Sequence, residues 1–141
     1  GGRPGTALPE RSPDAPPGTR VLLVEDNATQ AELFAEALGA AGFRVEAARN
    51  GLEALERAAE IGPDVVVMDV QMPGMDGLEA TRRLRATPAL RETPVLALTA
   101  LVMPGDRERC RAAGVDEYLA KPVPLAELVA AVSRLARRGK G

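Results

Sequence analysis

Strand-like and helix-like segments alternate five times between residues 20 and 138, and this order limits the folds that the chain can adopt. Each short apolar run is followed by a segment in which apolar residues recur at helical spacing. The run Val65-Val66-Val67-Met68 shows no alternation with polar residues, as expected for a parallel strand covered on both faces. We therefore expect an α/β protein with a doubly wound, five-stranded parallel sheet and right-handed crossovers.

The expected helices begin at residues that can cap them, namely Asn27, Asn50 and Asp76. A fourth helix is expected from about Pro104 to Ala113, and the last one is clearly amphipathic. The strands are expected at 21–24, 44–48, 65–68, 95–98 and 117–120. The residues expected to face the core are Ala31, Phe34, Ala35 and Leu38 in the first helix, Leu52, Leu55 and Ala59 in the second, and Leu125, Leu128, Val129, Val132 and Leu135 in the last.

The two ends of the chain differ from this pattern. Residues 1–19 are rich in Pro and Gly and have few apolar residues, so we expect a linker or disordered tail there. One domain is expected over 20–138, and 139–141 are expected to form a disordered end. The chain opens on Gly1-Gly2 without an initial Met, which favours a piece cut from a longer protein.

Composition argues against several functions. Aromatic residues make up only 2% of the chain and the net charge is −2, so neither base stacking nor a basic field for nucleic acid is expected. The chain has no histidine, which removes histidine bases, catalytic triads and the usual zinc ligands. A single cysteine, Cys110, favours a reducing compartment, and no apolar run approaches a membrane span. We expect a cytoplasmic protein that contacts neither nucleic acid nor membrane.

Three acidic residues lie where two apolar strands are expected to end. Glu25 and Asp26 follow the first strand and Asp69 follows the third. If these strands are neighbours, the acids meet in one crevice at the carboxyl edge of the sheet. At about 4 Å and an effective dielectric constant near 20, each like-charge pair costs about 4 kcal/mol. A hard divalent cation would offset this repulsion, and few carboxylates with room for water favour Mg²⁺.

Two further polar residues, Thr99 and Lys121, lie at the ends of the last two expected strands. In a parallel sheet these strand ends point the same way, so a hydroxyl and an ammonium group join the acids at one edge. Such a set suits transfer of a phosphoryl group to a carboxylate, in which cations and donors bind the phosphoryl oxygens. Taken singly, each of these residues is an ordinary cap or surface residue, and only the set indicates chemistry.

The segments VLLVEDN, DVVVMDVQMPGMDG, PVLALTA and YLAKPV resemble the receiver domain of two-component response regulators over about residues 20–138. The resemblance implies the strand order 2-1-3-4-5 of flavodoxin-like folds. It implies that Asp69 accepts the phosphoryl group of a phosphohistidine on a kinase or phosphotransfer domain. It also implies that Glu25, Asp26 and Asp69 bind Mg²⁺, together with the backbone carbonyl of Gln71.

The same resemblance assigns roles to four more residues. Lys121 would bind the phosphoryl group and Thr99 would move toward it. Tyr118 would be an aromatic switch that turns inward as Thr99 moves. The bond from Lys121 to Pro122 is expected to be cis. The switching face would comprise the fourth helix, the last strand and the last helix.

Several alternatives remain open at this stage. Phosphatases of the haloacid dehalogenase type also use an aspartyl phosphate, but they have a second Asp where this chain has Gln71. A flavodoxin-like nucleotide or flavin binder would need a phosphate cradle where this chain has Glu25-Asp26-Asn27. A receiver that only docks is a third alternative, disfavoured because every chemical position is filled.

The form of the motifs favours the receiver of a hybrid sensor histidine kinase, with a stand-alone, single-domain regulator as the alternative. We expect no turnover enzyme in this fragment, only self-catalysed phosphorylation and dephosphorylation. A monomer or weak dimer is expected.

Overall fold

Eleven elements make up the part of the chain that the structure describes. The structure is a computed structural model, and it describes residues 18–72, 74–100 and 104–140. The elements in chain order are β1 (Arg20–Val24), α1 (Ala28–Ala40), β2 (Arg44–Ala48), α2 (Gly51–Ile61), β3 (Val65–Asp69), α3 (Gly77–Ala86), the 3₁₀ helix η1 (Pro88–Leu90), β4 (Val95–Thr99), α4 (Asp106–Ala113), β5 (Glu117–Ala120) and α5 (Leu125–Lys140).

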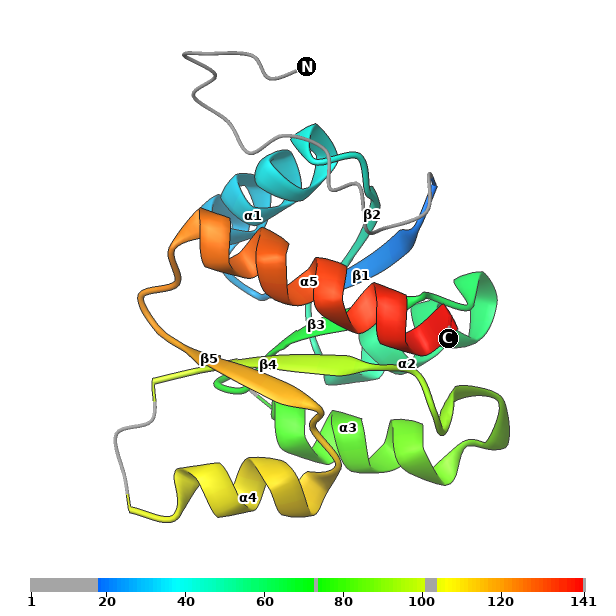
Figure 1. Ribbon diagram of the computed structural model, residues 1–141. Coiled ribbons are helices and arrows are strands. Elements are labelled where there is room, and N and C mark those ends of the chain that lie inside the picture. The colour runs from blue at the N-terminus through cyan, green and yellow to red at the C-terminus, as the bar shows by residue number, and fades with distance from the viewer. Residues whose placement is uncertain (1–17, 73, 101–103, 141) are drawn as a thin grey trace.

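The strands form one parallel sheet in the order β2-β1-β3-β4-β5 (Figure 1). Val21 is paired with Val65 across β1 and β3, and Asp69 is opposite Leu98 across β3 and β4. Because every pair is parallel, the carboxyl ends of all five strands lie at one edge of the sheet. The predicted fold class and strand order are confirmed.

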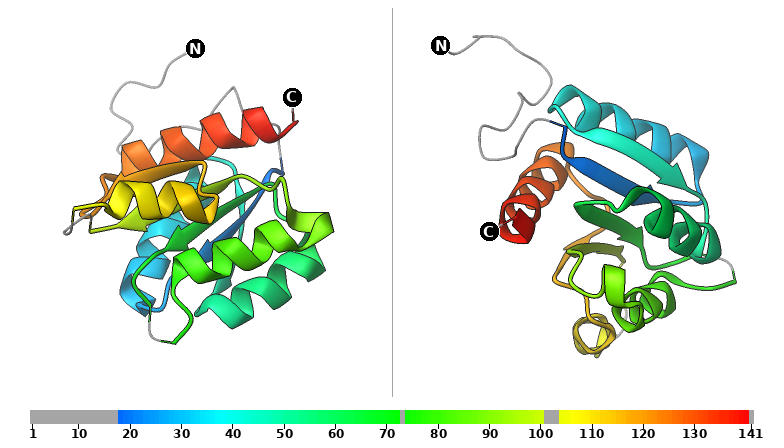
Figure 2. Two further views of the ribbon diagram at one scale, coloured as in Figure 1. Left: turned by 90° about the horizontal axis from the view of Figure 1, so that it is seen from below. Right: turned by 90° about the vertical axis from the view of Figure 1, so that its right-hand side faces the viewer.

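Helices cover both faces of the sheet, as Figures 1 and 2 show. Alternate residues of the central strands point to opposite faces, so Val65 and Val67 pack under α1 and α5 while Val66 and Met68 pack under α2 and α3. Helix α4 packs mainly on α3, where Cys110 contacts the Leu78 cluster. The predicted core residues of α1 and α5 all lie in or against the first of these clusters.

The helix starts follow from side-chain caps. The carboxamide oxygens of Asn27 and Asn50 accept hydrogen bonds from backbone N–H groups three residues later, at 2.9 and 2.8 Å. The carboxylate of Asp76 does the same for α3, at 2.8 Å. These bonds satisfy N–H groups that have no partner inside the helix. The three predicted caps are confirmed.

The predicted buried face of α2 is confirmed only at Leu55, which is half-buried and packs against the cluster that contains Val66 and Met68. Leu52 is 59% exposed and Ala59 is also exposed, whereas the buried residues are Gly51, Ala54 and Ala58. Small residues face the neighbouring elements here because the space is narrow. A methyl group on Gly51 would lie within 3.0 Å of the side chain of Met75.

Other differences concern the ends of elements. Helix α4 begins at Asp106 rather than near 104, and η1 was not predicted. Residues 1–17 of the predicted linker lie outside the described residues, but Thr19 is buried and its carbonyl accepts from the N–H of Arg44. Helix α5 reaches Lys140. Within the described ranges, every helix is too short or too polar to cross a bilayer.

Candidate functional site

Three carboxyl groups meet at the carboxyl edge of the sheet, as the sequence indicated. Glu25 and Asp26 follow the last residue of β1, and Asp69 is the last residue of β3. One carboxylate oxygen from each of these residues lies within 4.8 Å of the other two. Strands β1 and β3 are direct neighbours, which is what brings the acids together.

Glu25 is one of the two buried acids of this group. Its side chain is buried, and its Oε2 accepts a hydrogen bond from the N–H of Asn27 at 3.1 Å. Its Oε1 is buried without a hydrogen-bond partner in the described part of the chain. Burial raises the pKa of Glu25 to about 7, and the Asp69 carboxylate adds to the rise, against the opposing effects of the Asn27 N–H and Lys121. A buried oxygen without a partner beside two more carboxylates is a donor set that fits a hard divalent cation.

Asp69 is bound on its other side by Lys121. The Nζ of Lys121 donates to Oδ1 of Asp69 at 2.8 Å, and the N–H of Gln71 donates to the same oxygen at 3.2 Å. Asp69 is only 1% exposed. Lys121 follows β5 directly, and its own N–H donates to the carbonyl of Thr99 at 2.8 Å. The Lys121–Pro122 peptide bond is cis, the geometry that the resemblance implies.

Thr99 and Tyr118 lie beside this group. Thr99 is the last residue of β4, is buried, and follows Leu98, which is opposite Asp69 in the sheet. Tyr118 lies in β5 and packs against the cluster that contains Leu78 and Cys110. The guanidinium of Arg107 lies 5.9 Å from the centre of the Tyr118 ring. The ring is therefore half-buried between β5 and α4.

The sequence analysis did not single out Gly77, the first residue of α3. A methyl group at this position would lie 2.3 Å from the carbonyl oxygen of Asp69 and 2.8 Å from Cγ of Met68. The N–H of Gly77 also donates to the carbonyl of Val70. Glycine at 77 thus lets α3 start against the strand that carries Asp69. The only signal in the sequence is the position of the glycine directly after the capping Asp76.

A family model of the response regulator receiver domain matches residues 21–133. The chain belongs to this family. The match reaches all five strands of the sheet and includes Glu25, Asp26, Asp69, Thr99 and Lys121. The receiver assignment replaces the phosphatase-like and nucleotide-binding alternatives.

Relatives agree with the assignment. The chain is 41% identical over 109 residues to the polar-differentiation response regulator DivK of Brucella anthropi, covering 77% of this chain and 89% of the relative. A receiver domain of a Syntrophus aciditrophicus signal transduction histidine kinase has a TM-score of 0.80 and 39% identity, over 84% of this chain and 90% of that one.

A third comparison concerns the metal. The receiver domain of the Pseudomonas aeruginosa sensor histidine kinase PA1611, solved with a magnesium ion coordinated in its active-site cleft, is 40% identical with a TM-score of 0.74. That alignment covers 84% of this chain and 98% of that one. The chain is thus a response regulator receiver domain of a two-component phosphorelay, a class that works with histidine kinases or phosphotransfer proteins.

Proposed function

We propose that Asp69 is the phosphoryl acceptor of this receiver domain. The observation that carries the proposal is the position of its carboxylate, buried between Glu25 and Asp26 on one side and the ammonium group of Lys121 on the other. The ammonium group of Lys121 lies 2.8 Å from Oδ1 of Asp69 and offsets part of the negative charge that the three acids bring together. The opening at the carboxyl edge of the sheet is where parallel α/β folds bind ligands.

The proposed reaction is an in-line displacement at phosphorus. A carboxylate oxygen of Asp69 forms the new P–O bond while the P–N bond of a phosphohistidine breaks. The electron pair of that bond stays on the imidazole nitrogen, which takes up a proton. Lys121 moves its hydrogen bonds from the free carboxylate to the phosphoryl oxygens, which carry the developing charge. Hydrolysis by water then restores Asp69.

Glu25, Asp26 and Asp69, with the carbonyl of Gln71, are the proposed ligands of Mg²⁺. When bound, the ion would neutralise the acids and the phosphoryl oxygens. The unpartnered Oε1 of Glu25 supports this assignment within the chain itself. Binding of the ion favours the deprotonated form of Glu25, whose pKa burial raises to about 7.

Thr99 and Tyr118 are the proposed switch. Phosphorylation adds about −1.5 to −2 of charge beside the strand that ends in Thr99, and gives its hydroxyl a strong acceptor. Movement of Thr99 would release space near Tyr118, which lies one strand away in β5. The resulting change would be read on the face formed by α4, β5 and α5.

The test is incubation with acetyl phosphate and Mg²⁺ followed by intact-mass measurement. We expect the mass of one phosphoryl group on the wild type, and none on Asp69→Asn or in the presence of a chelator. Asp64→Asn is the matched control, because Asp64 precedes β3 at the opposite edge of the sheet. It should be modified like the wild type. A phosphoryl group that persists on Asp69→Asn would place the acceptor elsewhere.

We further propose that this receiver spans residues 20–138 and works in the cytoplasm as part of a hybrid sensor histidine kinase. Support comes from two of the similar structures, which are receiver domains of histidine kinases. The alternative is a stand-alone regulator, supported by the coverage of 89% of the DivK response regulator. Sequencing the parent gene decides: a kinase core encoded upstream and in frame supports the first, and an in-frame stop codon before residue 1 supports the second.

A further inference from the structure

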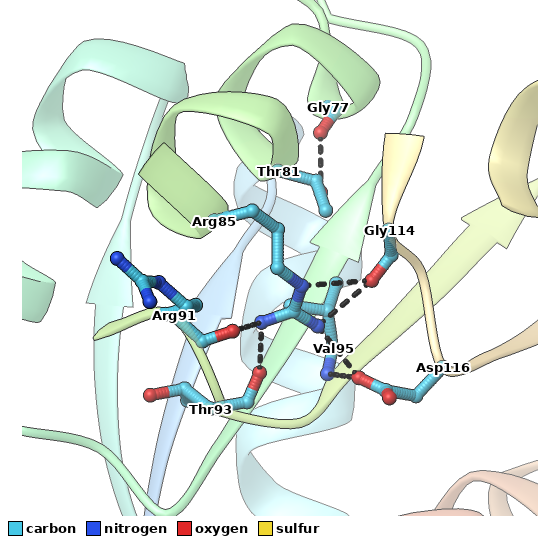
Figure 3. Close-up of polar contacts among 8 residues, drawn as sticks. All are labelled: Gly77, Thr81, Arg85, Arg91, Thr93, Val95, Gly114 and Asp116. Atoms are coloured by element: carbon cyan, nitrogen blue, oxygen red, sulfur yellow. Dashed lines mark hydrogen bonds and ion pairs between the residues drawn. The ribbon is translucent and has the colours of Figure 1, made fainter. Parts of the chain in front are cut away.

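Arg85, in the last turn of α3, uses all of its donors within the fold. Its Nε and Nη2 donate to the carbonyl of Gly114 at 3.0 and 2.8 Å, and Nη2 also donates to Oδ2 of Asp116 at 2.7 Å. Its Nη1 donates to the carbonyls of Arg91 and Thr93 at 2.8 and 2.7 Å. A guanidinium has five N–H groups, and here each has an acceptor (Figure 3). The side chain is 22% exposed.

The acceptors come from two loops that are far apart in the sequence. One leads from η1 into β4, and the other leads from α4 into β5. Asp116 ties the second loop directly to the start of β4, because its Oδ2 accepts from the N–H of Val95 at 2.8 Å and its N–H donates to the carbonyl of Val95. Arg85 and Asp116 together hold the amino ends of β4 and β5 against the end of α3.

The C-terminal end of α4 has a fixed geometry at this point. Gly114 has φ of +100°, and a methyl group there would lie 2.8 Å from Cγ of Arg85. The N–H groups of Gly114 and Val115 donate to the carbonyls of Arg111 and Cys110, and these bonds cap the C-terminal end of the helix. The carbonyl of Gly114 also accepts the hydrogen bonds from Nε and Nη2 of Arg85. This end of α4 is therefore held both by its backbone cap and by the side chain of Arg85.

The other end of α4 is built differently. Its N-cap is Gly105, with φ of +88° and no side-chain hydrogen bond to the helix. This end lies near the carboxyl edge of the sheet, where β4 ends in Thr99 (Figure 1). The Arg85 contacts lie at the opposite edge, four residues and about 13 Å along β4 from Thr99. The first residue of α4, Asp106, is buried and pairs with Arg109 of the same helix, whereas the C-terminal end is bound by Arg85 from α3.

We propose that Arg85 is a positioning residue that anchors the C-terminal end of α4 and the amino ends of β4 and β5. With that end fixed, a rearrangement that begins at Thr99 moves the N-terminal half of α4 and Tyr118 and leaves residues 110–116 in place. The inference rests on the proposed function of Asp69 and Thr99 for its trigger, while the anchor itself is present without phosphorylation.

Hydrogen exchange of the full chain, measured by mass spectrometry with and without acetyl phosphate and Mg²⁺, tests the proposal. In the unphosphorylated state, Arg85→Gln should raise exchange at 110–116 about tenfold. On phosphorylation, the wild type should change at 104–109, and in the variant the change should spread through 110–116. Tyr118 is the only tyrosine and there is no tryptophan, so tyrosine fluorescence follows its environment in the same samples.

Arg83→Gln is the matched control. Arg83 lies on the same helix, is 54% exposed and pairs with Glu79. It should leave exchange at 110–116 unchanged. Arg85→Lys separates charge from geometry, because one ammonium group cannot reach both loops. We expect it to resemble Arg85→Gln, and full protection in Arg85→Lys would overturn the geometric role.

Two further results would overturn the anchor: wild-type protection of 110–116 in Arg85→Gln, or equal changes along all of α4 in the phosphorylated wild type. If Arg85→Gln does not fold, Asp116→Asn takes its place, since it removes the ion pair but keeps an oxygen for Val95. It should raise exchange at 110–116 by a smaller factor, and unchanged exchange would count against the anchor. If the mass gain is absent, only the proposed function of Asp69 is refuted. The comparison of the unphosphorylated proteins still tests the anchor.

Discussion

At the scale of single residues, the site brings three acidic groups that repel one another close to one ammonium group. Glu25, Asp26 and Asp69 place carboxylate oxygens within 4.8 Å, and one ammonium group, that of Lys121, contacts Asp69. Burial makes the repulsion more costly for Glu25 than for the exposed Asp26. Burial is the main reason that the pKa of Glu25 rises to about 7, and the neighbouring Asp69 carboxylate adds to the rise.

The first prediction concerns pH. Because the pKa of Glu25 is about 7 in the folded state against 4.5 as the ordinary value, the folded state binds more protons between these values. Without Mg²⁺, the free energy of unfolding should therefore fall as pH rises from about 4.5 through 7, by at most about 3 kcal/mol from this group. Glu25→Gln should remove this part of the fall. Urea denaturation at a series of pH values, with chelator, measures it.

Mg²⁺ binding should show the opposite trend in the wild type. Its apparent affinity should increase with pH up to about pH 7, because Glu25 must lose its proton to act as a ligand. Calorimetric titration in two buffers of different ionisation enthalpy detects the released proton. Affinity that is independent of pH in this range would show that Glu25 is ionised in the free protein.

At the scale of elements, sequence patterns predicted the kind of element better than the side that it buries. The caps Asn27, Asn50 and Asp76 mark where helices start because capping is a local interaction. In α2, however, the larger Leu52 faces solvent while the small Ala58 faces the core. Leu52 and Ala58 belong to two different stripes of residues with helical spacing. The width of the gap between α2 and its neighbouring elements decides which stripe is buried.

The next prediction follows from that gap. Leu52→Ala should change the free energy of unfolding by no more than about 0.5 kcal/mol, since the side chain is exposed. Ala58→Leu should lower it by about 1–3 kcal/mol, since Ala58 is fully buried and the added atoms must displace neighbours. Both values come from urea denaturation. A larger cost for Leu52→Ala than for Ala58→Leu would mean that α2 buries the face predicted from the sequence.

At the scale of the whole molecule, parallel topology explains what the sequence could and could not predict. Asp26, Asp69 and Lys121 each follow or end a parallel strand, so the alternation of elements places them at one edge of the sheet, and the strand order β2-β1-β3-β4-β5 brings them together. The contacts of Arg85 with Gly114 and Asp116 span 29 and 31 residues and depend on how α3 crosses the sheet. No local pattern marks such contacts, so only the three-dimensional structure shows them.

The last prediction tests whether the acidic site is kept at a cost to the whole fold. Asp26→Asn should raise the stability of the metal-free domain, since one of three close carboxylates is lost. In the wild type, Mg²⁺ at 100 times its dissociation constant should add about 2.7 kcal/mol to the free energy of unfolding, and Asp26→Asn should lose most of this gain. Asp64→Asn, at the other edge of the sheet, should keep it. Thermal unfolding with chelator measures the stability of the metal-free domain, and unfolding with Mg²⁺ measures the gain from the ion. A gain in Asp26→Asn equal to that of the wild type would place the ion away from this residue.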